Sequence, residues 1–226
     1  MKRGRDFVAK KLLCIIANPK TDVNRSKGLQ IKEAYLEAFK EVQPDIEIET
    51  LDLFRMGEDE NPEIDTDLLY ARAGLSFMGK KLEDLTEDQQ RKYKAHVACA
   101  EKFMAADYYV FVSPIWNLGA PHIMKKYIDN LFIAGKTFSA TPDNRHGLLS
   151  GHVQHLQTRG GIYSEGPLKE LESSDRYLTI AMKFLGLTVH PVIYAEGLDH
   201  NPKQAPEIVA QTIEQAKIAA RELAKL

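Results

Sequence analysis

This sequence has little of what defines several common protein classes. It contains only two cysteines, Cys14 and Cys99, which excludes a disulfide framework, a CxxC redox pair and a thiolate zinc cluster. Its 30 Lys and Arg residues nearly balance 32 Asp and Glu residues, giving a net charge of −2, which predicts no nucleic-acid partner. The apolar run at 12–17 is too short for a signal peptide or a membrane span. We therefore expect a cytoplasmic protein with no membrane partner.

What the sequence does contain is typical of a globular protein. Of its 226 residues, 44% are hydrophobic and 27% are charged, which suits one sizeable core. We expect a mobile basic N-terminal arm at 1–10 and a single domain at 11–226. Charged residues, Gly and Pro are mixed near 55–85, and this mixture predicts an insertion with short helical pieces.

Apolar runs and amphipathic stretches alternate along the chain. The pattern predicts strands at 12–17, 46–51, 108–112, 152–158 and 188–195, and helices at 29–42, 86–105, 121–134, 173–185 and 206–224. Parallel neighbouring strands need helical crossovers. The alternation therefore predicts an α/β fold, a doubly wound five-stranded parallel sheet of order 2-1-3-4-5 with helices on both faces. Ligands of such sheets bind beyond the carboxyl ends of the strands where the order reverses, here at loops 18–26, 114–119 and 158–166.

The first of these loops suits a phosphate. It ends where a helix begins, and the free N–H groups of a helix N-terminus attract anions. Asn24 and Ser26 offer neutral donors there, and Arg25 offers a charge-assisted one. The alternative interpretation is an ordinary N-cap beside a solvated arginine.

The other two loops offer an aromatic wall and a close backbone approach. Trp116, the only tryptophan, stands between Pro114 and Pro121, so its ring suits the face of a flat ligand or else closes the core. Gly160 and Gly161 directly follow a strand, where their backbone either approaches a ligand or simply forms a tight turn. Together the three loops favour a mononucleotide with a flat ring, above all FMN.

Two other patterns carry less weight. Residues 74–81 (GLSFMGKK) have the Walker A spacing, but Lys81 replaces the Ser or Thr and no strand precedes them. The seven histidines have neither HExxH spacing nor cysteine partners, so we expect no metal site.

The three loops also carry a resemblance to a known family. The segments ANPKTDVNRS, SPIWNLGAPHIMKKYIDNLFIAGKTF, TRGGIYSEGP and FLGLTVHPVIYAEGLDHNP are similar to those of the FMN-dependent NADH:quinone oxidoreductases known as azoreductases, in the flavodoxin-like group. The resemblance covers most of 11–54 and 107–226, and the insertion matches less clearly. It implies a flavodoxin-like fold and FMN as the bound cofactor.

The resemblance implies a role for each loop. It places the FMN phosphate against Asn18, Asn24, Arg25 and Ser26, the isoalloxazine ring against Ile115, Trp116, Asn117 and Leu118, and the pyrimidine edge of that ring against Thr158, Arg159, Gly160 and Gly161. Asn18 and Thr158 stand where the family usually has Ser, and Asn24-Arg25-Ser26 stands where Ser-x-Ser is usual. The hydrogen-bond donors are nevertheless kept. No catalytic side chain is implied, because the chemistry takes place at N5 of FMN.

The resemblance further implies a homodimer whose partner chain completes the active site with an aromatic roof over the flavin. Phe138 and Tyr163 are the candidates, and simple packing under the loop is the alternative. The implied activity is two-electron ping-pong hydride transfer from NADH or NADPH through FMN to quinones and azo compounds. Two rivals are a flavodoxin-type single-electron carrier and a binding module without a cofactor.

Overall fold

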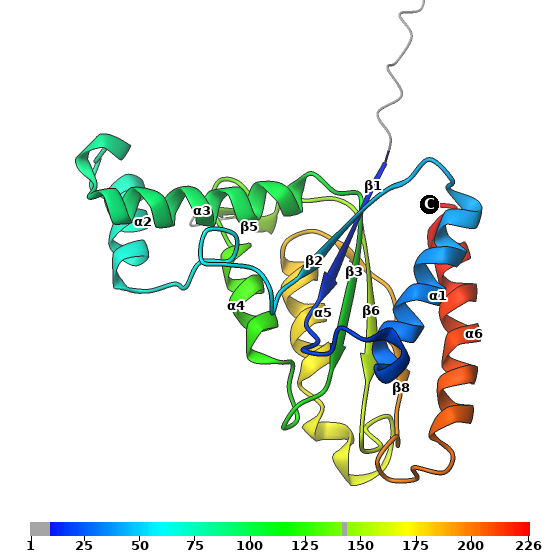
Figure 1. Ribbon diagram of the computed structural model, residues 1–226. Coiled ribbons are helices and arrows are strands. Elements are labelled where there is room, and N and C mark those ends of the chain that lie inside the picture. Colours follow the sequence, from blue (N-terminus) through cyan, green and yellow to red (C-terminus); the bar gives the residue numbers. More distant parts are fainter. Residues whose placement is uncertain (1–9, 142–143) are drawn as a thin grey trace, which may run out of the picture.

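The computed structural model describes residues 10–141 and 144–226, and Figure 1 shows a central sheet between two layers of helices. All pairs within this sheet are parallel, in the order β2-β1-β3-β6-β7, with β8 also paired to β6. The strands are β1 (Lys11–Ile16), β2 (Glu47–Asp52), β3 (Tyr108–Pro114), β6 (His152–Thr158), β7 (Thr188–Val189) and β8 (Ile193–Ala195). The doubly wound prediction is confirmed. The arm expected at 1–10 lies, except for Lys10, outside the described residues.

The fifth predicted strand is in fact two short strands. Residues 188–195 form β7 and β8, which both pair with β6 but are separated by a segment that contains Pro191. Proline has no N–H to donate to a sheet ladder, so a continuous strand is interrupted there. The side chain of Gln154 instead donates to the Pro191 carbonyl at 2.8 Å. The expected count of five strands therefore becomes six, while the order of the predicted sheet is kept.

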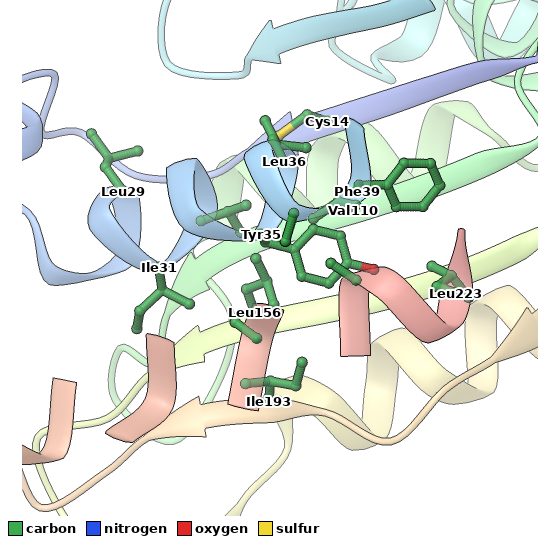
Figure 2. Packing of buried hydrophobic residues seen from close by; sticks show 14 of the residues in the cluster. Cys14, Leu29, Ile31, Tyr35, Leu36, Phe39, Val110, Leu156, Ile193 and Leu223 are labelled. Atoms are coloured by element: carbon green, nitrogen blue, oxygen red, sulfur yellow. The ribbon is translucent and has the colours of Figure 1, made fainter. Parts of the chain in front are cut away.

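Each face of the sheet has its own apolar core. α1 (Lys27–Val42) and α6 (Ala205–Leu223) cover one face, and α3 (Glu87–Met104), α4 (His122–Asn130) and α5 (Ser174–Phe184) cover the other. Successive residues of a strand point to opposite faces, so Leu12 and Cys14 of β1 belong to one core and Leu13 to the other. Figure 2 shows Tyr35 of α1 between the sheet and α6. Burial on both faces is why β1 is apolar throughout.

The segment expected as an insertion contains α2 (Thr66–Phe77) and the 3-10 turn η2 (Leu82–Asp84). Asp65 caps α2 by accepting from the Leu68 N–H at 3.0 Å. The same carboxylate lies 2.6 Å from Nζ of Lys92 on α3, and Asn130 of α4 donates to Asn61 at 3.0 Å. These polar contacts attach the segment to α3 and α4. The Walker-like residues 74–81 begin inside α2 and follow no strand, so they form no phosphate loop.

One antiparallel hairpin was not anticipated. β4 (Phe138–Thr141) pairs with β5 (Asn144–Gly147), just after the helix predicted at 121–134. That helix ends early, at Asn130, because Thr137 turns the chain by accepting the Ile133 N–H and donating to the Leu131 carbonyl. The hairpin strands are short and largely polar, so they lack the alternation that identifies a strand in sequence. Within the described ranges, no helix is long and apolar enough to cross a membrane.

Candidate flavin-binding site

The three loops singled out in the sequence meet at the carboxyl ends of the strands, which lie at the lower end of the view in Figure 1. There they surround a cavity of about 270 Å³. Its lining includes most of the predicted site, namely Asn18, Arg25, Ser26, Ile115, Trp116, Thr158, Arg159 and Gly160. The topological rule therefore located the cavity correctly before any side chain was considered.

The first loop presents α1 to the cavity. Ser26 is the N-cap of α1, and its Oγ accepts from the Leu29 N–H and from Nδ2 of Asn18, the latter at 3.1 Å. Asn18 and Ser26 are both almost fully buried. Arg55 holds the loop from outside by donating to the Pro19 carbonyl at 2.7 Å. The positive end of the α1 dipole is thus directed at the cavity, beside two neutral polar side chains.

Arg25 lies at the rim rather than inside. It ends the 3-10 turn η1 (Val23–Arg25), its side chain is 86% exposed, and its Nε is 3.6 Å from Asp22. An exposed pair at that distance is weak, so the guanidinium is free to turn toward a bound anion. Asn24 does not line the cavity and faces a separate groove beside α6. Lys20 and Lys27, which the sequence analysis did not single out, line the cavity and add positive charge.

The second loop is a tight turn with an unusual backbone. Trp116 and Gly119 exchange N–H···O bonds of 2.8 and 2.9 Å around Asn117 and Leu118. Those two residues have φ values of 46° and 74°, the left-handed conformation of a type I′ turn. Asn tolerates this region, whereas a leucine there is strained. Ser173, just before α5, braces the turn by donating its N–H and its hydroxyl to the Leu118 carbonyl.

Trp116 is not the core anchor that the alternative interpretation proposed. Its side chain is 40% exposed and lines the cavity. One of its neighbours is Phe54, whose ring centroid is 6.1 Å away at an angle of 59°. Ile115, whose N–H is bonded to the Thr158 carbonyl at 2.9 Å, joins the two loops. The indole is therefore held beside the cavity with its surface still available to a ligand.

The third loop offers backbone rather than side chains. The carbonyls of Gly160 and Gly161 accept from N–H groups of residues 197, 199 and 200. Across the described chain, neither glycine N–H donates to a protein acceptor. Arg159 is only 4% exposed, and its guanidinium turns away from the cavity to Gln157, Glu196 and the Tyr194 ring. Its backbone N–H also donates to the Ala195 carbonyl, at 2.8 Å. Arg159 lines the cavity, and the contact expected between it and the pyrimidine edge stays a prediction.

Tyr163 and Phe138 were paired as roof candidates but lie far apart in this chain. Tyr163 lines a second, adjoining cavity of about 410 Å³ together with Gly161. Phe138 packs against Phe184, with ring centroids 5.5 Å apart, at the far end of α5 from Ser173. Because α5 has 11 residues, that end is about 16 Å from the Trp116 turn. Only Tyr163 is therefore at the site of its own chain, and Phe138 as a partner's roof residue stays a prediction.

A protein-family model described as the flavodoxin-like fold matches residues 10–219. The chain belongs to this flavodoxin-like family. It is 42% identical over 217 residues to FMN-dependent NADH:quinone oxidoreductase 3 of Bacillus anthracis, covering 95% of this chain and 98% of the relative. It is 39% identical over 208 residues to the FMN-dependent NADH:quinone oxidoreductase of Geobacillus kaustophilus (strain HTA426), covering 92% and 96%. These matches confirm the resemblance found in the loops.

Solved structures of the flavodoxin-like family give the same result. An azoreductase from Bacillus anthracis str. Sterne superimposes with a TM-score of 0.85 at 31% identity, covering 94% of this chain and 99% of that one. An FMN-dependent NADH-azoreductase from Bacillus anthracis str. Ames Ancestor, in complex with FMN, has a TM-score of 0.85 at 29% identity, covering 95% and 99%. Both structural matches include the segment near 55–85, where the resemblance in sequence was least clear.

The geometry of this flavodoxin-like site fits FMN. Its α1 end combines a helix N-terminus with Lys20, Arg25 and Lys27, which suits a phosphate dianion. Gly160 lines the same cavity and Gly161 lines the adjoining one. Their N–H groups, which donate to no acceptor in the described ranges, suit the polar edge of a flat ring. Sequence analysis missed Leu198 and Asp199, which line the cavity from the loop before α6. The sequence feature that could have identified them is their position in the segment GLDHNP, which follows a strand of the same sheet.

A buried polar chain lies behind the second loop. Ser113 of β3 is 3.0 Å from Nε2 of His155 on β6, and Nδ1 of His155 is 2.9 Å from the Asp175 carboxylate on α5. The three residue types are those of a hydrolytic triad, but Ser113 is 2% exposed and cannot meet a substrate. These three residues instead connect β3 and β6 to the first turn of α5. Because Ser113 directly precedes Pro114, these contacts hold the start of the loop that carries Trp116.

Proposed function

We propose that this chain is an FMN-dependent NAD(P)H:quinone oxidoreductase that also reduces azo compounds. One observation carries the proposal: the cavity at the switch point has a cationic helix N-terminus, and its lining includes Gly160, whose N–H donates to no acceptor among the described residues. Relatives at 42% and 39% identity that match nearly the whole chain are named FMN-dependent NADH:quinone oxidoreductases. Bound there, FMN would take two electrons as hydride from NADH or NADPH and deliver them to a quinone or azo compound.

The α1 end of the cavity holds the phosphate in this proposal. Ser26 and Asn18 offer neutral hydrogen bonds from buried positions, so they need little reordering on binding. Arg25, Lys20 and Lys27 add charge from the rim. Asn24 contributes only if η1 moves, because it lines the groove beside α6 and not the cavity.

The other two loops hold and tune the ring. Ile115 and Trp116 form an apolar wall of the cavity. Asn117 and Leu118 do not line the cavity, and their tight turn holds Trp116 in place beside it. The N–H groups of Gly160 and Gly161, with Thr158 beside them, would stabilise negative charge on the reduced ring. The backbone N–H of Arg159 is already bonded to the Ala195 carbonyl, so Arg159 would act by holding this loop in place. No side chain of this chain is required as an acid or a base. The acceptor needs only to stack on the ring at hydride distance, about 3–3.5 Å.

A homodimer and a cytoplasmic location belong to the same proposal. Ile180 and Phe184 on α5 are 61% and 39% exposed, an apolar surface that a second copy would cover. Phe138 packs on Phe184 at this surface, so the partner's copy of it could reach the site that Tyr163 borders. Sedimentation analysis tests this directly: a dimer that Ile180→Glu splits supports it, and a monomer at all concentrations contradicts it.

An absorption experiment tests the activity itself. The purified protein is mixed with FMN, desalted, and treated without oxygen first with NADH and then with benzoquinone. Retained flavin that bleaches with NADH and recovers with quinone is the expected result. Retained flavin that NADH cannot bleach would indicate a single-electron carrier, and failure to retain flavin would indicate a module without a cofactor.

A further inference from the structure

Asp199 places a carboxylate beside Gly160, at the part of the cavity assigned to the flavin ring. Its N–H donates to the Gly160 carbonyl at 3.0 Å, and the neighbouring His200 N–H donates to the same oxygen at 3.2 Å. The carboxylate lies so close to Gly160 that a Cβ on that glycine would collide with it. Asp199 is therefore held by backbone hydrogen bonds against the loop assigned to the pyrimidine edge, and it lines both adjoining cavities.

This carboxylate has no direct partner among the described residues. In the part of the chain that the structure describes, it forms no ion pair and accepts no side-chain or backbone hydrogen bond. Glu196, the acid nearest to it in the chain, is by contrast occupied by Arg159 and by the Tyr163 and Ser164 N–H groups. Lys20, Arg25 and Lys27 line the first of these cavities, the inner cavity, where they serve the phosphate in the proposed function. None of the three lines the adjoining cavity that contains Tyr163, the outer cavity.

The residues that line the outer cavity include an acidic side chain and no lysine or arginine, whereas Lys20, Arg25 and Lys27 line the inner one. Asp199 is the one acidic residue among the lining residues of the outer cavity, and His200 and Tyr163 are the other ionisable ones there. Ile115 and the two glycines complete the lining. A flat acceptor approaching the ring past Tyr163 would meet this single negative charge before it stacked.

We infer that Asp199 determines the charge class of the electron acceptor, favouring neutral and cationic acceptors over anionic ones of the same flat shape. The inference rests on the proposed function, whose site it refines. A negative group on the acceptor is repelled by the carboxylate, and a unit-charge interaction across a few ångströms of water-exposed space changes affinity by about fivefold. Salt should remove most of the effect, because the Debye length falls from about 30 Å at 0.01 M to about 3 Å at 1 M ionic strength.

The test uses the FMN-loaded protein and a matched pair of acceptors, a naphthoquinone and its sulfonate. The protein is reduced beforehand, so that the charge of NADH does not enter the measurement. For each acceptor, the second-order rate constant for reoxidation of the reduced protein is measured. At low ionic strength, Asp199→Asn should raise the rate constant of the sulfonate, relative to that of the neutral quinone, by about three- to tenfold. Asp199→Glu should keep the wild-type ratio. Glu37→Gln, which removes an exposed charge from the middle of α1, serves as the control and should also keep it.

A binding measurement supplies a readout independent of turnover. Dissociation constants of two non-reducible probes, naphthalene-2-sulfonate and naphthalene-2-carboxamide, are obtained from the perturbation of flavin absorption. Asp199→Asn should tighten the sulfonate relative to the amide by a similar factor, and high salt should abolish the difference. If the flavin is retained and bleached by NADH but neither ratio moves, this inference is overturned while the proposed function stands. If no flavin is retained, the proposed function fails, and the inference fails with it.

Discussion

Two arginines that line the same cavity show how much a single residue's role depends on distant partners. Arg25 and Arg159 both fall in loops that the sequence analysis assigned to the ligand. Arg25 is 86% exposed at the cavity rim, whereas Arg159 is 4% exposed and bound to Glu196 and Tyr194 of the β8 segment. Those partners lie more than thirty positions away, so no local pattern could have revealed that Arg159 is structural.

Arg25→Ala should weaken FMN binding without weakening the fold. Loss of a charge-assisted hydrogen bond to the phosphate costs about 1.5–3 kcal/mol, or roughly ten- to a hundredfold in Kd. Titration of FMN fluorescence measures the change, and thermal unfolding of the apoprotein should be the same as in wild type. Arg176→Ala, an exposed arginine on α5, is the matched control. An unchanged Kd would remove Arg25 from the site.

His96 should make the protein less stable in acid. Burial lowers the pKa of its imidazole below the usual 6.5, although the hydrogen bond to Asn130 opposes this. The unfolded chain then binds the proton more tightly than the folded one, so the free energy of unfolding declines as pH falls through about 6.5 and is fully kept above it. His96→Gln cannot titrate. Denaturant unfolding at about pH 7.5 and 5.5 should show a smaller loss for this variant than for wild type, and equal losses would contradict the assignment.

At the scale of elements, sequence was most reliable where one local pattern dominated. β6 was predicted with its observed bounds at 152–158, and the ends of α6 lie within one residue of the prediction. Prediction failed where a single residue or a tertiary contact decided the outcome. Pro191 divided the last strand, and Thr137 ended α4 and opened the hairpin. For the site, strand ends and loop composition sufficed to predict its place. They did not single out Lys20, which belongs to no motif, or Asp199, whose only signal was its position after a strand.

The turn at Asn117 and Leu118 stores strain beside the cavity, and its removal should be measurable. Leu118 has a φ of 74°, where a leucine costs roughly 1–2 kcal/mol and a glycine almost nothing. Leu118→Gly should therefore leave the free energy of unfolding unchanged or slightly raised, despite the lost side chain. Leu69→Gly, at an exposed position of α2, should instead cost about 1 kcal/mol. Denaturant unfolding compares the two, and an equal loss in both would show that the turn is unstrained.

For the whole molecule, the two cysteines report on global unfolding. Cys14 lies in the core under α1 and α6, and Cys99 lies in the core on the opposite face. Burial raises the pKa of both thiols to about 12, so almost no thiolate exists near neutral pH. A thiol reagent should therefore label the native protein only as fast as the molecule opens, and both sites should react at once in denaturant. Rapid labelling of either site without denaturant would mean that its core opens locally.

Pro191 also matters for how the protein behaves in a crowded solution. An uninterrupted outer strand leaves a row of unpaired backbone groups to which another chain can add, which is a route to aggregation. Here β7 and β8 offer only two short pieces separated by a residue without an N–H. The other outer strand, β2, carries Glu47 and Glu49. Pro191→Val should let the outer strand become continuous, and light scattering at high protein concentration should then increase relative to wild type. The break in the strand thus lets this sheet end in solvent without recruiting further chains.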